Sequence, residues 1–143
     1  LHYRRELRLL GVRGQDLRWA TERVVRALIQ VLEDPQGRWI LQSHPKSDSE
    51  LKVTMIKDGL LRQLRLDRTF IDEVGTRWII DYKTSSHEGG GKKAFLESEV
   101  IRYRSQLENY ARAISQMGDR NIRVGLYFPL LQALESWEPD LNN

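Results

Sequence analysis

Two carboxylates and a lysine follow apolar, strand-like runs in the middle of the sequence. Asp67 ends the apolar part of LRLDRTF, and Asp81 and Lys83 end the run WIIDYK. A hairpin can bring carboxylates from successive strands together, and hard cations such as Mg²⁺ prefer oxygen ligands of this kind. A bound metal ion lowers the pKa of water and screens developing charge, and a positioned lysine can assist. These residue types in this order fit metal-assisted cleavage of a phosphodiester.

Strand periodicity predicts how this group is arranged. Residues two apart in a strand share a face, so Asp81 and Lys83 point one way while Ile80 and Tyr82 point the other. The backbone carbonyl of Tyr82 is then available as a further metal ligand beside the two carboxylates. We expect Asp67 on the adjacent strand near the same end, with the register left open. We also expect the charged groups to face a cleft and not the core.

A second group of polar residues lies on a long helix that the sequence predicts after these strands. Gln106 and Tyr110 are four residues apart and share one helix face, and Arg102 lies one turn earlier. This face could contact the backbone of a nucleic acid. Lys92 and Lys93 precede it in a glycine-rich loop, and we expect them to form a basic rim with Arg102 and the strand-end lysine.

Each of these residues also has a purely structural explanation. An Asp-x-Lys at a strand end is commonly a solvated ion pair. Arg68 could simply pair with Asp67 or Asp72. Gln106 and Tyr110 could be a surface residue and a core residue of the helix. Only the combination, in order and on suitable elements, favours a site.

The N-terminal part of the sequence is helical. A short helix is expected at residues 4–10 and a longer amphipathic helix at residues 15–33, because apolar residues recur there at steps of three and four. The inward positions of the longer helix are Leu17, Ala20, Val24, Leu28 and Val31. A turn is expected at residues 34–37, a docked apolar turn at residues 39–41, and a loop at residues 44–49.

The middle of the sequence predicts three strands in an antiparallel meander. One strand begins near Leu51, and the others cover residues 63–72 and 76–83. Gly59 and Gly75 mark the hairpin turns, since glycine tolerates positive φ. The third strand contains three consecutive apolar residues, which is typical of a central strand covered on both faces.

A long helix and two further strands complete the expected fold. The helix has a stripe of apolar residues at steps of four and three, formed by Leu96, Val100, Tyr103, Leu107, Tyr110, Ile114 and Met117. Alternation predicts a fourth strand at residues 122–128, and residues 133–137 are a candidate edge strand. The element order indicates an α/β fold, a mixed α+β sandwich with helices N-terminal. One domain is expected over residues 1–143, with a helical lead-in at 1–45 and an α/β core at 46–138.

Composition sets wider limits. Hydrophobic residues make up 40% and charged residues 30%, and no apolar run reaches membrane-spanning length, so we expect no membrane partner. The absence of cysteine excludes disulfides and thiolate metal sites and fits a cytoplasmic protein. A net charge of +3 and a pI near 9.3 permit a nucleic-acid partner without indicating one. The histidines are isolated in the sequence, so none is assigned to a metal: His2, His44 and His87.

The three motifs LDRTF, IIDYKTS and QLENYA closely resemble the RecB-like branch of the PD-(D/E)XK nuclease superfamily. Residues 67–68, 81–84 and 106–110 match its pattern of Asp-Arg, Asp-Tyr-Lys-Thr and Gln-x-x-x-Tyr one by one. Glu50 is similar to a Glu that often opens a strand before the first Asp. The resemblance covers at least residues 48–129.

The resemblance implies a restriction-endonuclease-like core that binds Mg²⁺ or Mn²⁺. It implies a metal-dependent DNA exonuclease domain of an ATP-dependent helicase-nuclease that processes double-strand breaks. The partners would be DNA ends, together with helicase domains of the same chain or of a partner subunit, as in RecB and AddA. The implied catalytic residues are Asp67, Asp81 and Lys83, with Asp67, Asp81 and the Tyr82 carbonyl on the metal and with support from Gln106, Tyr110, Arg68 and Arg102. The alternatives are an inactive nuclease-like module that binds DNA or serves a structural role, and an unrelated α+β adaptor domain.

Two positions depart from the family pattern. Leu64 stands where the family often has a glycine, three residues before the first Asp. Many RecB-like members also carry a His or Glu on an earlier helix as a further metal ligand, and His2 and Glu6 lack the surroundings of that residue. The sequence begins at Leu1 within a helical pattern. We therefore expect a C-terminal fragment of a larger protein, with the further ligand located upstream.

Overall fold

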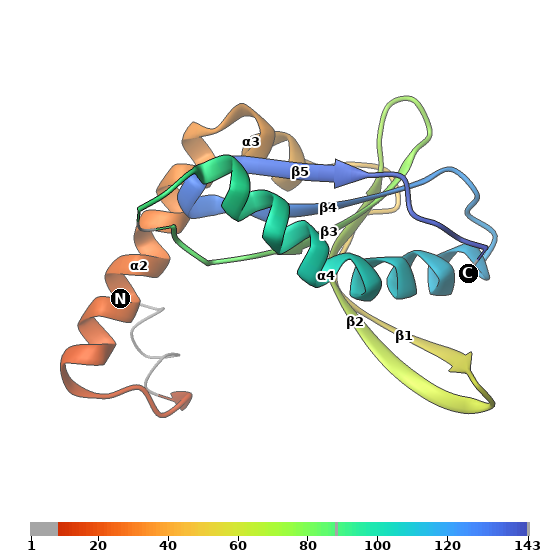
Figure 1. The fold of residues 1–143 in the computed structure, drawn as a ribbon, viewed down its shortest axis with the longest axis horizontal. Helices are drawn as coiled ribbons and strands as arrows, with labels where there is room; N and C mark the ends of the chain where they lie inside the picture. The colour runs from red at the N-terminus through yellow and green to blue at the C-terminus, as the bar shows by residue number, and fades with distance from the viewer. Residues whose placement is uncertain (1–8, 88, 143) are drawn as a thin grey trace.

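A computed structural model describes residues 9–87 and 89–142. Helices lead into three consecutive strands, which a long helix and two further strands follow (Figure 1). In chain order the elements are α2 (Gly14–Glu33), α3 (Pro35–Leu41), β1 (Asp48–Lys57), β2 (Leu60–Ile71), β3 (Arg77–Tyr82), α4 (Lys92–Ser115), β4 (Ile122–Phe128), the 3₁₀ helix η1 (Pro129–Leu131) and β5 (Ala133–Trp137).

The strands form one mixed sheet in the order β1-β2-β3-β4-β5. The antiparallel meander of β1, β2 and β3 is confirmed, and β5 is the expected edge strand. β4 pairs with β3 in parallel, because α4 carries the chain back along the sheet before β4 begins. The carboxyl ends of β3 and β4 therefore meet at one edge. The mixed α/β fold is confirmed.

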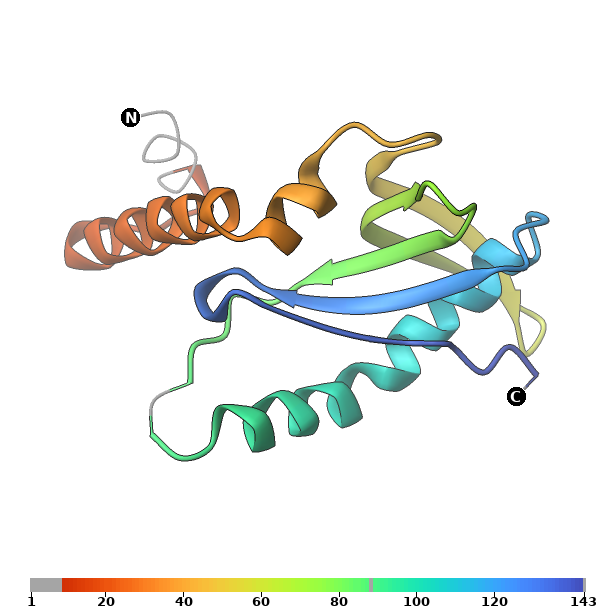
Figure 2. The ribbon, with the colours of Figure 1, turned by 90° about the horizontal axis from the view of Figure 1, so that it is seen from above.

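Helices cover both faces of the sheet (Figure 2). α4 packs on one face over a cluster that includes Ile79 and Leu126, and α2 and α3 pack on the other face over a cluster that includes Ile80 and Tyr127. Neighbouring residues of β3 thus enter two different cores. This confirms the expectation that β3 is central and covered on both sides.

The hairpin of β1 and β2 extends beside the C-terminal half of α4 (Figure 1). Its turn has φ of 53° at Asp58 and 74° at Gly59, and the next turn has φ of 85° at Gly75, as the turn residues predict. The ammonium of Lys57 donates to Asn109 Oδ1 of α4 at 3.0 Å. The hairpin is therefore tied to the helix that also carries part of the candidate site.

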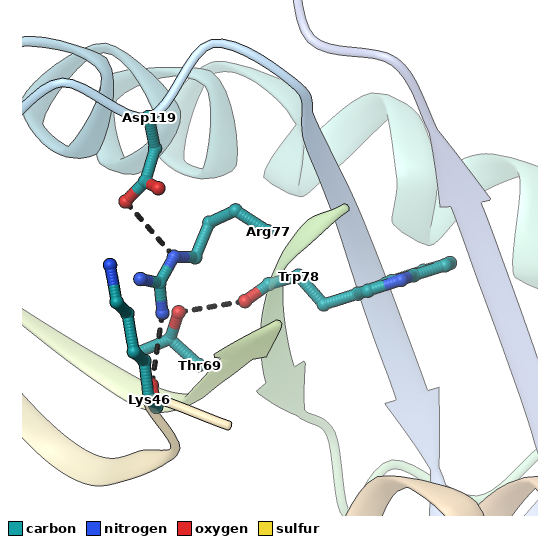
Figure 3. Close-up of polar contacts among 5 residues, drawn as sticks. All are labelled: Lys46, Thr69, Arg77, Trp78 and Asp119. Atoms are coloured by element: carbon teal, nitrogen blue, oxygen red, sulfur yellow. Dashed lines mark hydrogen bonds and ion pairs between the residues drawn. The ribbon is translucent and has the colours of Figure 1, made fainter. Parts of the chain in front are cut away.

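Polar contacts fix the start of β3 (Figure 3). The buried Arg77 side chain donates to Asp119 Oδ2 and to the carbonyl of Lys46, both at 3.0 Å. The Thr69 hydroxyl donates to the carbonyl of Trp78 at 2.8 Å. These bonds join β2, β3, the loop before β1 and the turn before β4. They fix the position of β3, whose C-terminal end carries Asp81.

The segment after α2 corrects one prediction. The turn expected around Asp34 is the start of α3, and residues 39–41 belong to this helix and do not form a separate docked turn. The Asp34 carboxylate accepts a hydrogen bond from the Gly37 N–H at 3.3 Å, and Pro35 occupies the first turn, where its missing N–H costs nothing. The buried hydroxyl of Tyr127 donates to Asp34 Oδ2 at 2.8 Å and joins this cap to the sheet.

Other expected positions shift for simple packing reasons. Leu28 is exposed, and Ala27 is buried instead, on a helix whose main contacts are with α3 and η1. Met117 is exposed because it lies beyond the end of α4. The expected loop at residues 44–49 ends earlier, since β1 already begins at Asp48. Residues 4–8 of the short predicted helix lie outside the described residues, as do His2 and Glu6.

The membrane prediction has one structural test. Within residues 9–87 and 89–142, no helix combines the length and apolar character that crossing a bilayer requires.

Candidate active site

Asp67, within β2, and Asp81, near the end of β3, lie at neighbouring positions of the sheet. The ladder between these strands ends at the pair Arg68 and Ile80, so Asp67 and Asp81 would form the next pair. At this point the Asp67 carboxylate accepts a hydrogen bond from the Tyr82 N–H, at 3.0 Å. A side chain from β2 thus replaces the backbone partner. The register that the sequence left open places Asp67 and Asp81 at neighbouring positions of adjacent strands, near enough for the charge of Asp67 to act on Asp81.

An irregularity in β1 lies opposite Asp67. The pairing of β1 with β2 is interrupted at Glu50, which has a φ of 55°, an uncommon value for a residue other than glycine. Leu66 packs on the α4 side of the sheet, whereas Phe70, four residues later in β2, packs on the other side. A regular strand would place both on one face, so β2 changes face between Leu66 and Phe70. Glu50 itself forms an exposed ion pair with Arg65 at 2.7 Å.

Asp81 and Lys83 share a face and form an ion pair. Lys83 Nζ lies 2.6 Å from Asp81 Oδ2, and the same ammonium lies 3.7 Å from the centre of the Tyr103 ring on α4. The Lys83 N–H donates to the carbonyl of Tyr127 at 2.9 Å, so the pairing of β3 with β4 holds the lysine in line with the strand. The ammonium is fixed between a carboxylate and an aromatic face.

The burial of this pair corrects the expectation of a cleft. Asp81 is only 5% exposed, and the Lys83 side chain is 16% exposed. Within the described part of the chain, no hydrogen bond of regular geometry reaches Asp81 Oδ2, so the ion pair is what compensates its burial. Burial raises the pKa of Asp81, the neighbouring charge of Asp67 raises it further, and Lys83 opposes both effects.

Two residues of α4 near this pair were not predicted as site residues from the sequence. Tyr103 was assigned only to the apolar stripe, yet its ring contacts Lys83 and also lies 5.1 Å from the guanidinium of Arg102. Glu99 is buried one turn earlier, with Oε1 3.6 Å from Arg102 Nη1. The signal for Glu99 was present, because it lies three residues after Leu96 and four before Tyr103 in an otherwise apolar stripe.

The remaining predicted residues on α4 divide into a core residue and surface residues. Gln106 Nε2 donates to the Tyr110 hydroxyl at 2.6 Å, and Tyr110 is otherwise buried in the core. Gln106 is exposed one turn after Tyr103, and Arg102 is exposed beside it. Gln106 and Arg102 are therefore placed where a ligand over the ion pair could be contacted.

Arg68 has a supporting position in the structure. Its guanidinium donates to the carbonyls of Ile40 at 3.2 Å and Gln42 at 3.0 Å, at the end of α3, and also to the hydroxyl of Ser49 at 3.2 Å. These bonds tie α3 to β2 next to Asp67. The guanidinium is engaged by the protein itself, so the structure favours site support over direct contact with DNA.

The lysines of the expected basic rim begin α4 and do not lie in a loop. Lys92 Nζ donates to the carbonyl of Leu131 at 2.8 Å, so it closes the start of α4 onto η1. Lys93 is exposed and lies 3.9 Å from Glu97 one turn later. Lys93 and Arg102 thus remain on the surface of α4, while Lys92 has a structural contact.

The residues present fit part of a magnesium site. Asp67 and Asp81 supply two carboxylates, and the peptide of Tyr82 lies against Asp67. Mg²⁺ is commonly held by one or two carboxylates together with water and substrate phosphates. Among residues 9–87 and 89–142, no group of three or more His, Asp or Glu side chains is gathered as metal ligands. The buried Asp81 oxygen, which has only Lys83 as its partner, is the observation that fits a cation here.

Metal binding is expected to depend on Asp81 and on pH. Protons compete with a metal for the carboxylate, and the raised pKa of Asp81 extends this competition to higher pH than for an ordinary aspartate. Titration calorimetry with Mn²⁺ should therefore show binding that weakens as the pH falls through this pKa. Asp81→Asn should abolish the heat, while Glu73→Gln, in the exposed turn before β3, should retain it. Equal heats for wild type and Asp81→Asn would contradict the assignment.

Comparisons with known proteins add no assignment of their own. No protein-family model matches the sequence, and no curated protein matches it. A function must therefore be argued from the geometry of Asp67, Asp81 and Lys83 and from the motif resemblance.

Proposed function

We propose that this chain is a metal-dependent DNA nuclease domain that hydrolyses phosphodiester bonds. The observation that carries the proposal is the placement of Asp67 and Asp81 at neighbouring positions of adjacent strands, with Lys83 ion-paired 2.6 Å from Asp81. By its motif resemblance, it would act as the exonuclease domain of an ATP-dependent helicase-nuclease in double-strand-break repair. The same resemblance supports a restriction-endonuclease-like core.

The side chains of the site have separate tasks in this proposal. Asp67, Asp81 and the carbonyl of Tyr82 would hold Mg²⁺ or Mn²⁺. The metal would supply an activated water and a positive charge beside the scissile phosphate. Lys83 is a mostly buried cation that Asp81 and Tyr103 hold in place, so it can stabilise charge that develops on the phosphate with little reorganisation.

The exposed face of α4 would position the nucleic acid. Arg102 and Gln106 lie one turn apart beside Tyr103 and can contact phosphate oxygens, which fixes the strand without reading its sequence. Binding should therefore weaken as salt rises, because each neutralised phosphate releases counterions.

The runner-up function is an inactive nuclease-like module that binds DNA or has a structural role. The burial of Asp81 and its ion pair with Lys83 is the observation that favours it, since a buried pair can be purely structural. The position of Asp67 next to Asp81 favours a catalytic function, because a purely structural ion pair between Asp81 and Lys83 has no need of a second carboxylate.

A digestion assay separates these functions. The chain is incubated with end-labelled linear DNA and Mn²⁺, and the intact helicase-nuclease that the proposal implies is assayed with Mg²⁺ and ATP. The proposal predicts acid-soluble nucleotides in the presence of metal and none with EDTA. DNA that is bound but stays intact in both assays would support the inactive module.

A further inference from the structure

A cavity of about 570 Å³ lies between α2, the segment that follows β3, and η1. Its walls include Trp19, Arg23 and Arg26 of α2, together with Ser86 and Leu131. None of the residues assigned to the candidate active site lines it. The cavity therefore needs an explanation of its own.

The cavity lies at the edge of the sheet where β3 and β4 both end. Arg23 Nη2 donates to the carbonyl of Thr84 and, at 3.2 Å, to the hydroxyl of Ser86. Thr84 directly follows Lys83, and the three residue steps from Lys83 to Ser86 span at most about 11 Å. In open α/β sheets the carboxyl ends of the strands are the usual place for ligands. A group in the cavity would thus be a near neighbour of Lys83.

The lining of the cavity combines an aromatic surface with positive charge. Trp19 is 62% exposed although it is a large apolar residue, and the guanidinium of Arg23 lies 5.2 Å from the centre of its ring. Arg26 is exposed one turn of α2 further along. Glu22 is the acidic residue of the lining, so the two arginines leave a net positive charge. An exposed indole beside cations is the combination on which nucleic-acid bases stack while their phosphates are neutralised.

We propose that this cavity is a nucleotide-binding subsite, in which Trp19 stacks on a base and Arg26 holds the adjoining phosphate of the same DNA strand. The inference deepens the proposed nuclease function and rests on it for the identity of the strand. A base can reach Trp19 only when it is unpaired, so the subsite takes single-stranded DNA. Arg23 is already bonded to Thr84 and Ser86, and it orders the wall that joins the subsite to Lys83.

The test is binding of a short fluorescent oligothymidylate by the whole chain in EDTA, where no cleavage occurs. Trp19→Ala should weaken binding about tenfold, the usual effect of losing one stacked base, while Trp19→Phe retains most of the affinity. Arg26→Ala should weaken binding. It should also reduce the slope of the logarithm of the binding constant against the logarithm of the salt concentration by the amount expected for about one phosphate contact. Arg120→Ala, an exposed arginine before β4, is the matched control and should bind like wild type.

The outcomes separate this inference from the proposed function. Unchanged binding by Trp19→Ala, or no binding by wild type, would overturn the subsite, and Mn²⁺-dependent digestion would still decide the nuclease proposal. Binding is measured in EDTA and needs no cleavage, so a failure of cleavage leaves the binding result intact. Thymidine monophosphate that competes as strongly as the oligonucleotide would assign the cavity to free nucleotides and overturn a strand subsite.

Discussion

Asp81→Ala is expected to lower the rate of metal-dependent DNA cleavage by at least about a hundredfold, because it removes one of the two carboxylates available to the metal. In the intact helicase-nuclease, ATP-driven unwinding should remain nearly unchanged, since ATP would be hydrolysed elsewhere. The measurement is digestion of linear duplex DNA with Mg²⁺ and ATP, beside an unwinding assay.

Two control variants distinguish a loss of catalysis from a loss of the fold. Alanine leaves the mostly buried Lys83 without its partner, which lowers the free energy of unfolding, whereas Asp81→Asn keeps the shape of the side chain. Both variants should lose cleavage, while Glu73→Gln should retain it. If Asp81→Asn is folded by circular dichroism and degrades DNA at the wild-type rate, the inactive module is the better explanation.

Lys83→Ala is expected to reduce cleavage on the order of a hundredfold or more, the typical effect of losing one positioned group at developing charge. Lys83→Arg should not restore the rate fully, because the ammonium lies 2.6 Å from Asp81 and 3.7 Å from the Tyr103 ring centre, and a planar guanidinium cannot occupy that position in the same way.

The lysine variants also distinguish electrostatic assistance from metal binding. Mn²⁺ affinity measured by calorimetry should not fall in Lys83→Ala, because the carboxylates of Asp67 and Asp81 remain. Lys52→Ala, at an exposed position of β1, should cleave DNA at nearly the wild-type rate. Wild-type cleavage by Lys83→Ala would show that the ion pair has only a structural role.

Much of the candidate site follows from local periodicity. A strand alternates its faces, so the placement of Asp81 with Lys83, opposite Ile80 and Tyr82, could be predicted from spacing alone. The turns at Gly59 and Gly75 could also be predicted from neighbouring residues, since a backbone with positive φ favours glycine. These features depend on a few neighbouring residues, and the structure confirms them.

The features that sequence could not predict depend on contacts between distant segments. The hydrogen bond from the Tyr82 N–H to Asp67 lies opposite the interrupted pairing at Glu50, and no alternation in the sequence reveals either feature. The burial of Asp81 depends on how α4 lies over the sheet. Asp34 followed by Pro35 is a signal both for a turn and for a helix start. In the structure a helix starts here, and the Tyr127 hydroxyl from the sheet donates to its N-cap residue, Asp34.

The central claim is that Asp67 and Asp81 hold one divalent cation together. Anomalous scattering from crystals of this chain grown with Mn²⁺ tests it most directly. The account predicts a single strong peak within about 2.0–2.2 Å of a carboxylate oxygen of each aspartate, with Lys83 beside it. A peak that touches only one of the two carboxylates, or no peak between β2 and β3 at saturating Mn²⁺, would contradict it.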